Sequence, residues 1–242
     1  FSSLKMNLDL KWLVIFVSVG LLLLFTALPM LYLVLRSVMA EGTLDLTTYW
    51  EVYGNIVNWK SFVNTIYISL VVTLISVVIS FPLAWLVGRT DLPGKGFFRT
   101  AFVTSYMIPP YVGAIAWTQL LNPSVGYLNE WLVHVFHLSA SPFDIYGVGG
   151  LVWCFTLFYS PFAFITISRA LEKMDPSLEE ASRVSGDSPL GTLWRVTLPL
   201  MFPRIFAGGV LVFLGVGSAF GIPAIVGMPA QIEVLTTRIV TY

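Results

Sequence analysis

The sequence predicts an all-α integral membrane protein. Of its 242 residues, 57% are hydrophobic and 11% are charged, whereas soluble proteins carry about 25% charged residues. Five stretches contain no Lys, Arg, Asp or Glu, and each has about the 20 residues that a helix needs to cross a bilayer. They are Trp12–Leu35, Phe62–Val87, Thr100–Leu121, Gly147–Ser168 and Ile205–Ile225.

The first stretch is predicted to remain in the protein as a span. Its apolar run is longer than the ~7–15 residues of a signal-peptide core, and no small-residue cleavage site follows it. Prolines lie in or beside several spans, where neighbouring helices can satisfy the carbonyl groups that they leave unpaired: Pro29, Pro82, Pro109, Pro110 and Pro161. Gly217 and Gly221 form a G-x-x-x-G pair, which either permits close helix packing or only marks a glycine-rich helix end.

The basic residues predict that the N-terminus is cytoplasmic. With that orientation, ten Lys and Arg residues fall on the cytoplasmic side and three on the outer side, namely Arg36, Lys60 and Arg238. This excess follows the positive-inside rule, and the opposite topology would invert it. Because 13 basic residues balance 13 acidic ones, no net charge attracts nucleic acid to the chain.

Two segments are expected on the outer side. The loop 122–146 has no Lys or Arg, and Trp131 favours a short interfacial helix within it. The tail Gly221–Tyr242 is apolar but is interrupted by prolines and charges, so we expect an outer or re-entrant stretch that leads to a sixth helix outside this sequence. The odd number of spans, and a first residue, Phe1, that is not Met, indicate a fragment of a longer protein.

The loop between the fourth and fifth spans has the most specific pattern. Asp175 can cap a helix that has Pro176 in its first turn, and Gly186 can end that helix in a left-handed turn. A second helical turn, at 189–195, then leads into the fifth span. The first helix would lie under the membrane and offer one shallow side to a partner, formed by Leu178, Ala181, Val184 and Ser185.

This loop resembles the EAA signature of permease subunits of ATP-driven, binding-protein-dependent importers. The match consists of Glu180-Ala181-Ser182, Gly186 after three residues, and Val196-x-Leu198-Pro199 after nine more. Ser182 and Val196 stand where the family has Ala and Ile, and both differences are conservative in size. Three further segments are similar to the fused permeases of iron(III) importers, although polyamine, thiamine, sulfate and phosphonate permeases share much of them: Ser105–Tyr111, Leu121-Asn122-Pro123 and Val234–Ile239.

The resemblance implies a type I ABC importer permease half, with five of an expected six spans and a cytoplasmic coupling helix. Residues 1–242 would form a single transmembrane domain, the N-terminal half of a longer two-half permease, with a coupling loop at 172–199. In that loop Glu180 would be the charged contact to an ATPase subunit, and Gly186 would be the turn that allows close packing. The other residues assigned to coupling are Ala181, Ser182, Asp187, Leu190, Leu198 and Pro199.

The resemblance also implies partners and a cargo. Two ATPase subunits would bind ATP and Mg²⁺, so this chain would be non-catalytic and hold no cofactor. An extracytoplasmic solute-binding protein would dock on 122–146 and Gly221–Tyr242. A second permease half would complete the path across the membrane lipid. The cargo would be iron(III), and the membrane would be a bacterial (inner) membrane. Four residues either line or gate this path or only pack in the core: Tyr106, Pro109, Phe213 and Phe220.

Other motifs indicate no chemistry of their own. Gly88 and Gly94 are separated by five residues and Gly96 follows Lys95, whereas a phosphate-binding loop has four intervening residues and a Ser or Thr after its Lys. His134 and His137 could share a face of an outer helix and bind metal, but we interpret them as incidental residues of a solvated helix and predict no metal site. Cys154 is expected to pack inside the fourth span.

A transporter driven by an ion gradient is the main alternative function. Such proteins place ionisable residues inside their spans as relays, and the five predicted spans contain no Asp, Glu, His, Lys or Arg. A structural scaffold would leave the signature in the loop unexplained. The sequence therefore favours an ATP-driven importer subunit.

Overall fold

The computed structural model describes residues 2–40 and 43–241, so Phe1 and Tyr242 lie outside the described residues. The chain divides into two compact units, 1–56 and 57–242. That both belong to one transmembrane domain remains a prediction.

The first unit contains the first span. Helix α1 (Ser2–Leu22), the π-helical turn η1 (Leu23–Ala27) and α2 (Leu28–Val38) follow one another, and the run Leu10–Val38 is long and apolar enough to cross a membrane. A small antiparallel hairpin of β1 (Met39–Ala40) and β2 (Thr43–Leu44) leads to α3 (Thr47–Gly54). This hairpin is the single β element of the described chain, which is otherwise helical as predicted.

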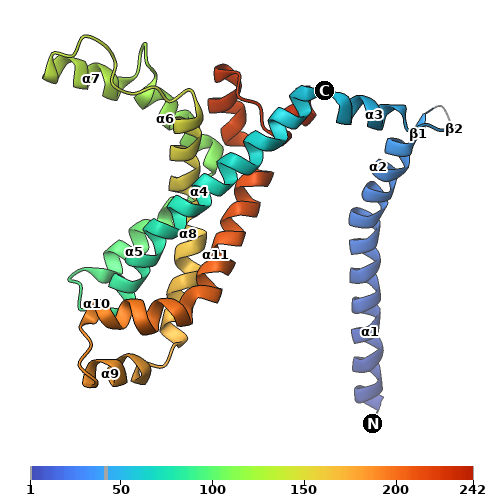
Figure 1. Cartoon of the computed structure of the whole chain (residues 1–242). Coiled ribbons are helices and arrows are strands. Elements are labelled where there is room, and N and C mark those ends of the chain that lie inside the picture. The colour runs from blue at the N-terminus through green and yellow to red at the C-terminus, as the bar shows by residue number, and fades with distance from the viewer. Residues whose placement is uncertain (1, 41–42, 242) are drawn as a thin grey trace. The chain divides into compact units, whose positions relative to one another are not determined.

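The second unit is a bundle of helices of unequal length (Figure 1). Three helices long and apolar enough to span a membrane form its frame: α4 (Ile56–Arg89), α8 (Val148–Lys173) and the continuous run Pro189–Ser218 that ends in α11 (Leu198–Ser218). The shorter elements are α5 (Lys95–Thr104), η2 (Ser105–Met107), α6 (Pro110–Leu121), α7 (Tyr127–Phe136), α9 (Ser177–Val184), α10 (Pro189–Thr192), η3 (Leu193–Thr197), η4 (Pro223–Gly227), η5 (Met228–Ala230) and α12 (Leu235–Thr241).

The third predicted span is not one helix, which corrects the expectation for Thr100–Leu121. It consists of α5, the short turn η2 and then α6. Ile108 and Pro109 between them have ψ angles of 125°, because a residue that precedes a proline is disfavoured in the helical conformation. Pro110 then begins α6, where its missing N–H costs nothing.

The fifth predicted span, Ile205–Ile225, is displaced in the structure. The helical run begins at Pro189 and ends at Ser218, after which Ala219 is extended and η4 begins at Pro223. The prediction began after Arg204 because it excluded charged residues. Arg204 is exposed on the surface of α11, so its charge does not end the helix.

Prolines explain the three π-helical turns found in the described residues. Each π-helical segment of the described chain ends two residues before a proline: Pro29, Pro199 or Pro229. In each segment the residue before the proline donates its N–H five residues back, as Leu198 does to the Leu193 carbonyl. A proline ring collides with the carbonyl four residues before it, and a widened turn removes that collision while the helix continues.

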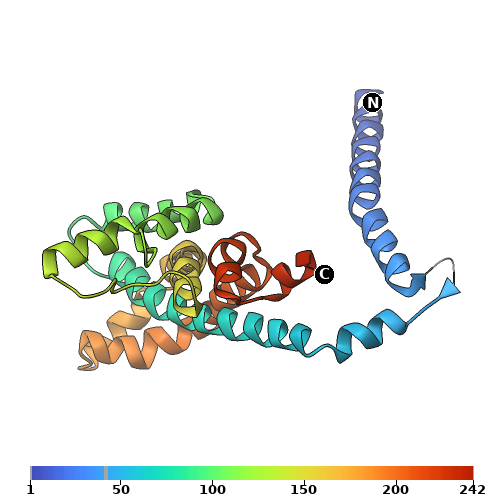
Figure 2. The same ribbon diagram turned by 90° about the horizontal axis from the view of Figure 1, so that it is seen from above.

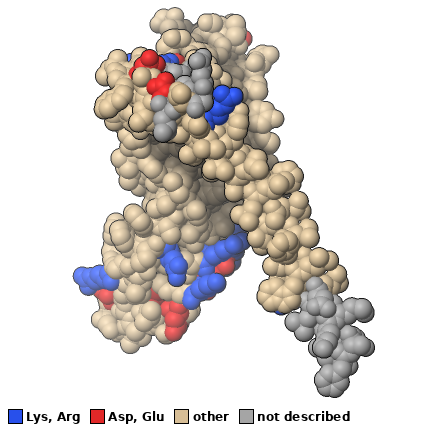
Figure 3. All heavy atoms as spheres, turned by 90° about the vertical axis from the view of Figure 1, so that its right-hand side faces the viewer, with Lys and Arg blue, Asp and Glu red and all other residues tan. Residues whose placement is uncertain are grey.

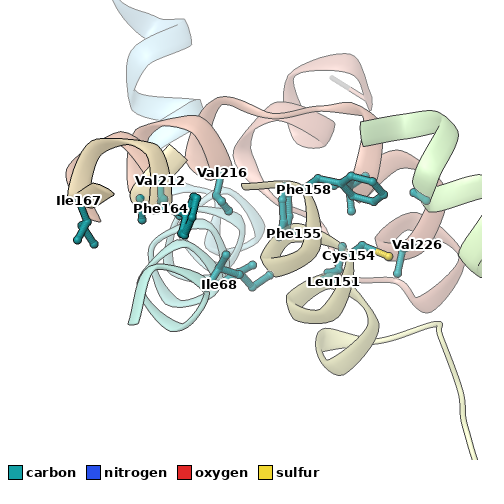
Figure 4. Packing of buried hydrophobic residues seen from close by; sticks show 14 of the residues in the cluster. Ile68, Leu151, Cys154, Phe155, Phe158, Phe164, Ile167, Val212, Val216 and Val226 are labelled. Carbon is teal, nitrogen blue, oxygen red and sulfur yellow. The ribbon is translucent and has the colours of Figure 1, made fainter. Parts of the chain in front are cut away.

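Helix α8 is the centre of the second unit. More than half of its most apolar stretch, 56%, is buried, against 22% for α4 and 33% for the run that contains α11. Figures 1 and 2 place it among α4, α6, α11 and η4. Its side chains Leu151, Phe155, Phe158 and Phe164 meet Ile68 of α4, Val212 and Val216 of α11 and Val226 of η4 in the core, and Cys154 packs there as predicted (Figure 4).

The break in the third span packs against a proline in α8. Pro161 has no N–H, so the Leu157 carbonyl lacks its helical partner. The Ser105 hydroxyl donates a hydrogen bond to this carbonyl over 3.3 Å. The prediction that neighbouring helices satisfy proline-freed carbonyls is thus confirmed at Pro161.

Gly150 tests the tight start of α8. A Cβ on Gly150 would overlap the Ile145 carbonyl oxygen, whereas a Cβ on the adjacent Gly149 would meet open space. We expect Gly150→Ala to destabilise the protein by about 1–3 kcal/mol through overpacking, and Gly149→Ala to leave stability unchanged or slightly raised. Thermal unfolding of both variants in detergent measures the difference, and equal melting temperatures would contradict the packing described.

Candidate functional site

The loop between α8 and α11 begins with the short helix α9, close to where the sequence places it. The Asp175 carboxylate accepts a hydrogen bond from the Ser177 N–H over 3.0 Å. This bond holds the pKa of Asp175 below its usual value. After α9, Gly186 has φ of +98°, the left-handed turn predicted at that residue.

The second half of the loop is held by Asp187. One of its carboxylate oxygens accepts from the Ser182 hydroxyl over 2.8 Å, and the other lies 2.7 Å from the Arg195 guanidinium. The Ser182 hydroxyl also lies 3.1 Å from that of Thr192. Ser182, which departs from the family pattern, therefore links α9 to α10. Asp187 joins the two halves of the loop through its contacts with Ser182 and Arg195.

Glu179 is the main residue that sequence reasoning missed. It is 5% exposed, although it precedes the exposed Glu180. One of its oxygens accepts a hydrogen bond of 2.6 Å from the Thr197 hydroxyl, and the other lies 3.2 Å from Arg89 Nε. The Arg89 contact is an ion pair without hydrogen-bond geometry at Nε.

Arg89 ties this carboxylate to the ends of two long helices. It is the last residue of α4, and its terminal nitrogen donates to the Leu171 and Met174 carbonyls at the end of α8, both over 2.8 Å. Glu179, Arg89 and Thr197, which we call the anchor cluster, therefore join α9 to α4, α8 and η3. Only a fold can reveal this cluster, because Arg89 is far from the loop in sequence.

The remaining surface of the loop is exposed. Of the residues assigned to coupling, Glu180, Ala181, Gly186, Leu190 and Pro199 are exposed, and Ser182, Asp187 and Leu198 are partly buried. Three large apolar side chains beside them are also exposed: Leu178, Val184 and Trp194. Charged side chains gather around this end of the second unit (Figure 3). Exposed apolar residues next to a tightly held backbone are typical of a docking surface.

The four candidate path residues come from different elements of the chain. Tyr106 of η2 packs edge-on against Phe162 of α8, with ring centroids 4.7 Å apart. Pro109 is the exposed residue before α6, Phe213 is partly buried in α11, and Phe220 is 44% exposed in the turn after it. Within the described chain, no hydrogen bond or ring contact joins any two of the four.

Two close approaches nevertheless bring these segments together. A Cβ on Gly221, next to Phe220, would lie 2.8 Å from the Cβ of Tyr111 in α6, so the turn after α11 packs on the start of α6. A Cβ on Gly217 would instead lie 3.4 Å from Ser69 Oγ of α4. Of the two interpretations of the G-x-x-x-G pair, the structure therefore supports close packing, and the two glycines pack against two different helices.

The end of the second unit opposite α9 carries α7 and the tail (Figure 1). The short helix predicted from Trp131 is confirmed as α7. The buried Asn129 side-chain amide donates hydrogen bonds to the carbonyls of Asn122 and Phe143, which lie in the loops on either side of α7. The tail is fastened to α4, because the Thr65 hydroxyl accepts from the Leu235 N–H over 2.9 Å. This packing explains why an apolar tail can end in short helices and turns.

No group of three or more His, Cys, Asp or Glu that could hold a metal ion occurs in the described part of the chain. His134 lies in the last turn of α7, and His137 follows it in a left-handed conformation with φ of 51°.

The buried carboxylate gives a stability test with its own control. We expect Glu179→Gln to lower the free energy of unfolding by about 3–5 kcal/mol, because Arg89 would keep its charge in a buried site without an ionic partner. Glu180→Gln removes the same charge from the adjacent exposed position and should leave stability within about 0.5 kcal/mol. Thermal unfolding in detergent compares the two variants, and the anchor cluster is refuted if they melt alike.

Residues 80–240 match the family described as the binding-protein-dependent transport system inner membrane component. An inner membrane ABC transporter permease protein of Escherichia coli is 30% identical over 190 residues, which cover 72% of this chain and 59% of that protein. A Haemophilus influenzae protein that is named, provisionally, as a ferric transport system permease is 28% identical over 74% of this chain and 28% of its own length.

Other relatives are named for molybdenum, sulfate and spermidine/putrescine transport. In fold, the chain resembles a bacterial ABC transporter involved in alginate import, with a TM-score of 0.77, 19% identity, and coverage of 98% of this chain and 85% of that one. The matched region spans about three fifths of the Escherichia coli relative. Because the family match extends over most of the chain, this protein belongs to the inner membrane permease components of binding-protein-dependent ABC transport systems.

Proposed function

We propose that this chain forms part of the membrane path of an ATP-driven importer and couples it to ATPase subunits through α9 and α10. The observation that carries the proposal is the contrast within one short helix. Glu179 is buried and bound to the spans, whereas Glu180 and the apolar residues beside it are exposed. A surface that is exposed but cannot shift independently is suited to receive a motion and transmit it.

The anchor cluster defines where such a motion would go. A displacement of α9 acts on α4 and α8 through Arg89, and on η3 and α11 through Thr197. Coupling needs contacts that differ between two states. We propose that closure of the ATPase subunits displaces α9, and that α4, α8 and α11 follow it to open the path outward before hydrolysis resets the subunit.

The proposed assembly follows from the two ends of the second unit. Two ATPase subunits, which bind ATP and Mg²⁺, meet the α9 end in the cytoplasm. A solute-binding protein meets the α7 loop and the tail on the outer side, and the chain itself is non-catalytic and holds no cofactor. The basic residues support an N-terminus in the cytoplasm, and the inner membrane relatives support the bacterial cell (inner) membrane.

A second permease half completes the path, and we propose that it is fused to this one. The match to only 28% of the length of the ferric relative supports this arrangement. Tyr106, Pro109, Phe213 and Phe220 remain the proposed lining or gate. The close packing of Gly221 on Tyr111 supports a joint role for the start of α6 and the turn after α11.

Iron(III) is the proposed cargo, supported by the segments Ser105–Tyr111 and Val234–Ile239 and by the ferric relative. Polyamine, thiamine, sulfate and phosphonate are the alternatives. Uptake of radioactive iron(III) by cells that express the complete transporter tests this directly. Iron-dependent uptake above that of cells without the transporter is expected, and uptake of an alternative cargo without any effect of iron would overturn the assignment.

The coupling role predicts a defect without unfolding. Glu180→Lys and Gly186→Val should each reduce ATP-dependent uptake at least tenfold, or leave ATP hydrolysis no longer stimulated by cargo, because the first reverses the contact charge and the second strains a residue at φ of +98°. Glu51→Lys, at an exposed site on α3, makes the same charge reversal outside α9, the α7 loop and the tail, and serves as the control for uptake per folded transporter.

The readouts are uptake and co-purification of the ATPase subunit, both normalised to folded protein. Normal uptake and normal ATPase retention in both variants would contradict the coupling role of α9.

A further inference from the structure

A basic pocket lies between the end of α8 and the start of α11. Its volume is about 510 Å³. Three cationic side chains line it: Arg169 and Lys173 from α8 and Arg204 from α11. Arg169 and Lys173 are four residues apart and so lie on the same side of their helix, facing the helix that carries Arg204.

None of the three cations is neutralised within the described chain. Among the described residues, none forms an ion pair or a side-chain hydrogen bond with Arg169, Lys173 or Arg204, and no acidic residue of that part of the chain lines the pocket. The nearby acid Glu172 is paired with Arg99 at 2.7 Å. Three positive charges around one cavity repel each other, so the pocket is suited to an anion that bridges them.

The rest of the lining indicates what kind of anion fits. Ile165, Leu200 and Met201 supply an apolar wall beside the cations. The pocket lies at the ends of two membrane-spanning helices, on the side that the distribution of basic residues assigns to the cytoplasm. A phosphate joined to a hydrocarbon body meets both parts of this lining, and anionic lipids are abundant in the cytoplasmic leaflet.

We propose that this pocket binds the phosphate headgroup of an anionic phospholipid of the cytoplasmic leaflet. Arg169, Lys173 and Arg204 hold the phosphate, and the apolar wall receives the first part of the acyl chains. Such a lipid would bridge α8 and α11 at the level where the loop of α9 joins them. The proposal requires the membrane-spanning helices but not any particular cargo.

Native mass spectrometry of the complete transporter tests the pocket. The protein, stripped of native lipid, is exposed to phosphatidylglycerol or to zwitterionic phosphatidylcholine, and the retained lipid is measured. The wild type should retain phosphatidylglycerol selectively. Arg204→Gln should weaken retention about fivefold, the equivalent of ~1 kcal/mol for one basic residue near an anionic lipid, and Arg169→Gln/Arg204→Gln should weaken it at least tenfold.

Lys11→Gln/Lys95→Gln is the matched control, because it removes two exposed cations from the same predicted side outside this pocket. It should retain phosphatidylglycerol like the wild type. If the double pocket variant fails to fold, the single Arg204→Gln decides the result. Equal retention by Arg204→Gln and wild type, or equal retention of the two lipids, would overturn the proposal.

A competing arm separates the lipid from a free oxyanion. Inorganic phosphate is added at the concentration at which phosphatidylglycerol saturates the wild type. Little displacement is expected, because inorganic phosphate gains nothing from the apolar wall. Full displacement at that concentration would identify a site for a soluble oxyanion and overturn the lipid assignment.

Discussion

A single buried carboxylate, that of Glu179, determines how the loop between α8 and α11 is held. Burying a charge is costly unless the site supplies a partner and hydrogen bonds. Here Arg89 supplies the opposite charge, Thr197 donates a short hydrogen bond, and the Leu171 and Met174 carbonyls satisfy the guanidinium. Every partner belongs to a different part of the bundle from α9, so α9 is held by the ends of the spans rather than by its own few residues.

The spans obey the same rule, because each backbone group that a proline leaves unpaired needs another hydrogen-bond partner. Lipid offers no hydrogen bonds, so a proline inside the membrane is tolerated only where another group satisfies the backbone that it frees. Ser105 does this for the carbonyl freed by Pro161, and the widened turns before Pro199 and Pro229 keep the chain helical there. The prolines thus produce a broken third span that packs on α8 and a tail that turns back on the bundle. Of these segments, the tail lies at the end away from α9, whereas the widened turn before Pro199 is bonded to α9 through Thr197 and Glu179.

Much of the fold could be predicted from the sequence because its signals are local. Apolar stretches placed the long helices, Trp131 indicated α7, and Gly186 marked the end of α9. The break at Pro109 and Pro110 was missed because continuous hydropathy hides it. The extent of α11 was misjudged at Arg204, since a charge near the helix start can lie on an exposed surface.

The anchor cluster could not be predicted in the same way. Glu179 and Glu180 are adjacent and chemically identical, and the pattern drew attention to Glu180. Which of them is buried depends on the end of α4, about ninety residues earlier in the chain. A short helix ordinarily buries residues three or four positions apart. Glu179 lies three positions before Ser182, whose hydroxyl donates a hydrogen bond to Asp187. This spacing was the one local signal in the sequence that Glu179 is buried.

The central claim is that α9 moves with the spans as one body. Spin labels at Arg183 on α9 and Phe202 on α11, both exposed, would report the distance between the two helices by pulsed electron paramagnetic resonance. The buried Cys154 is out of reach of a label. In the complete transporter, the distance should be narrow and unchanged between the nucleotide-free and ATP-trapped states. A broad distance, or one that changes between these states while the anchor cluster is intact, would contradict the account.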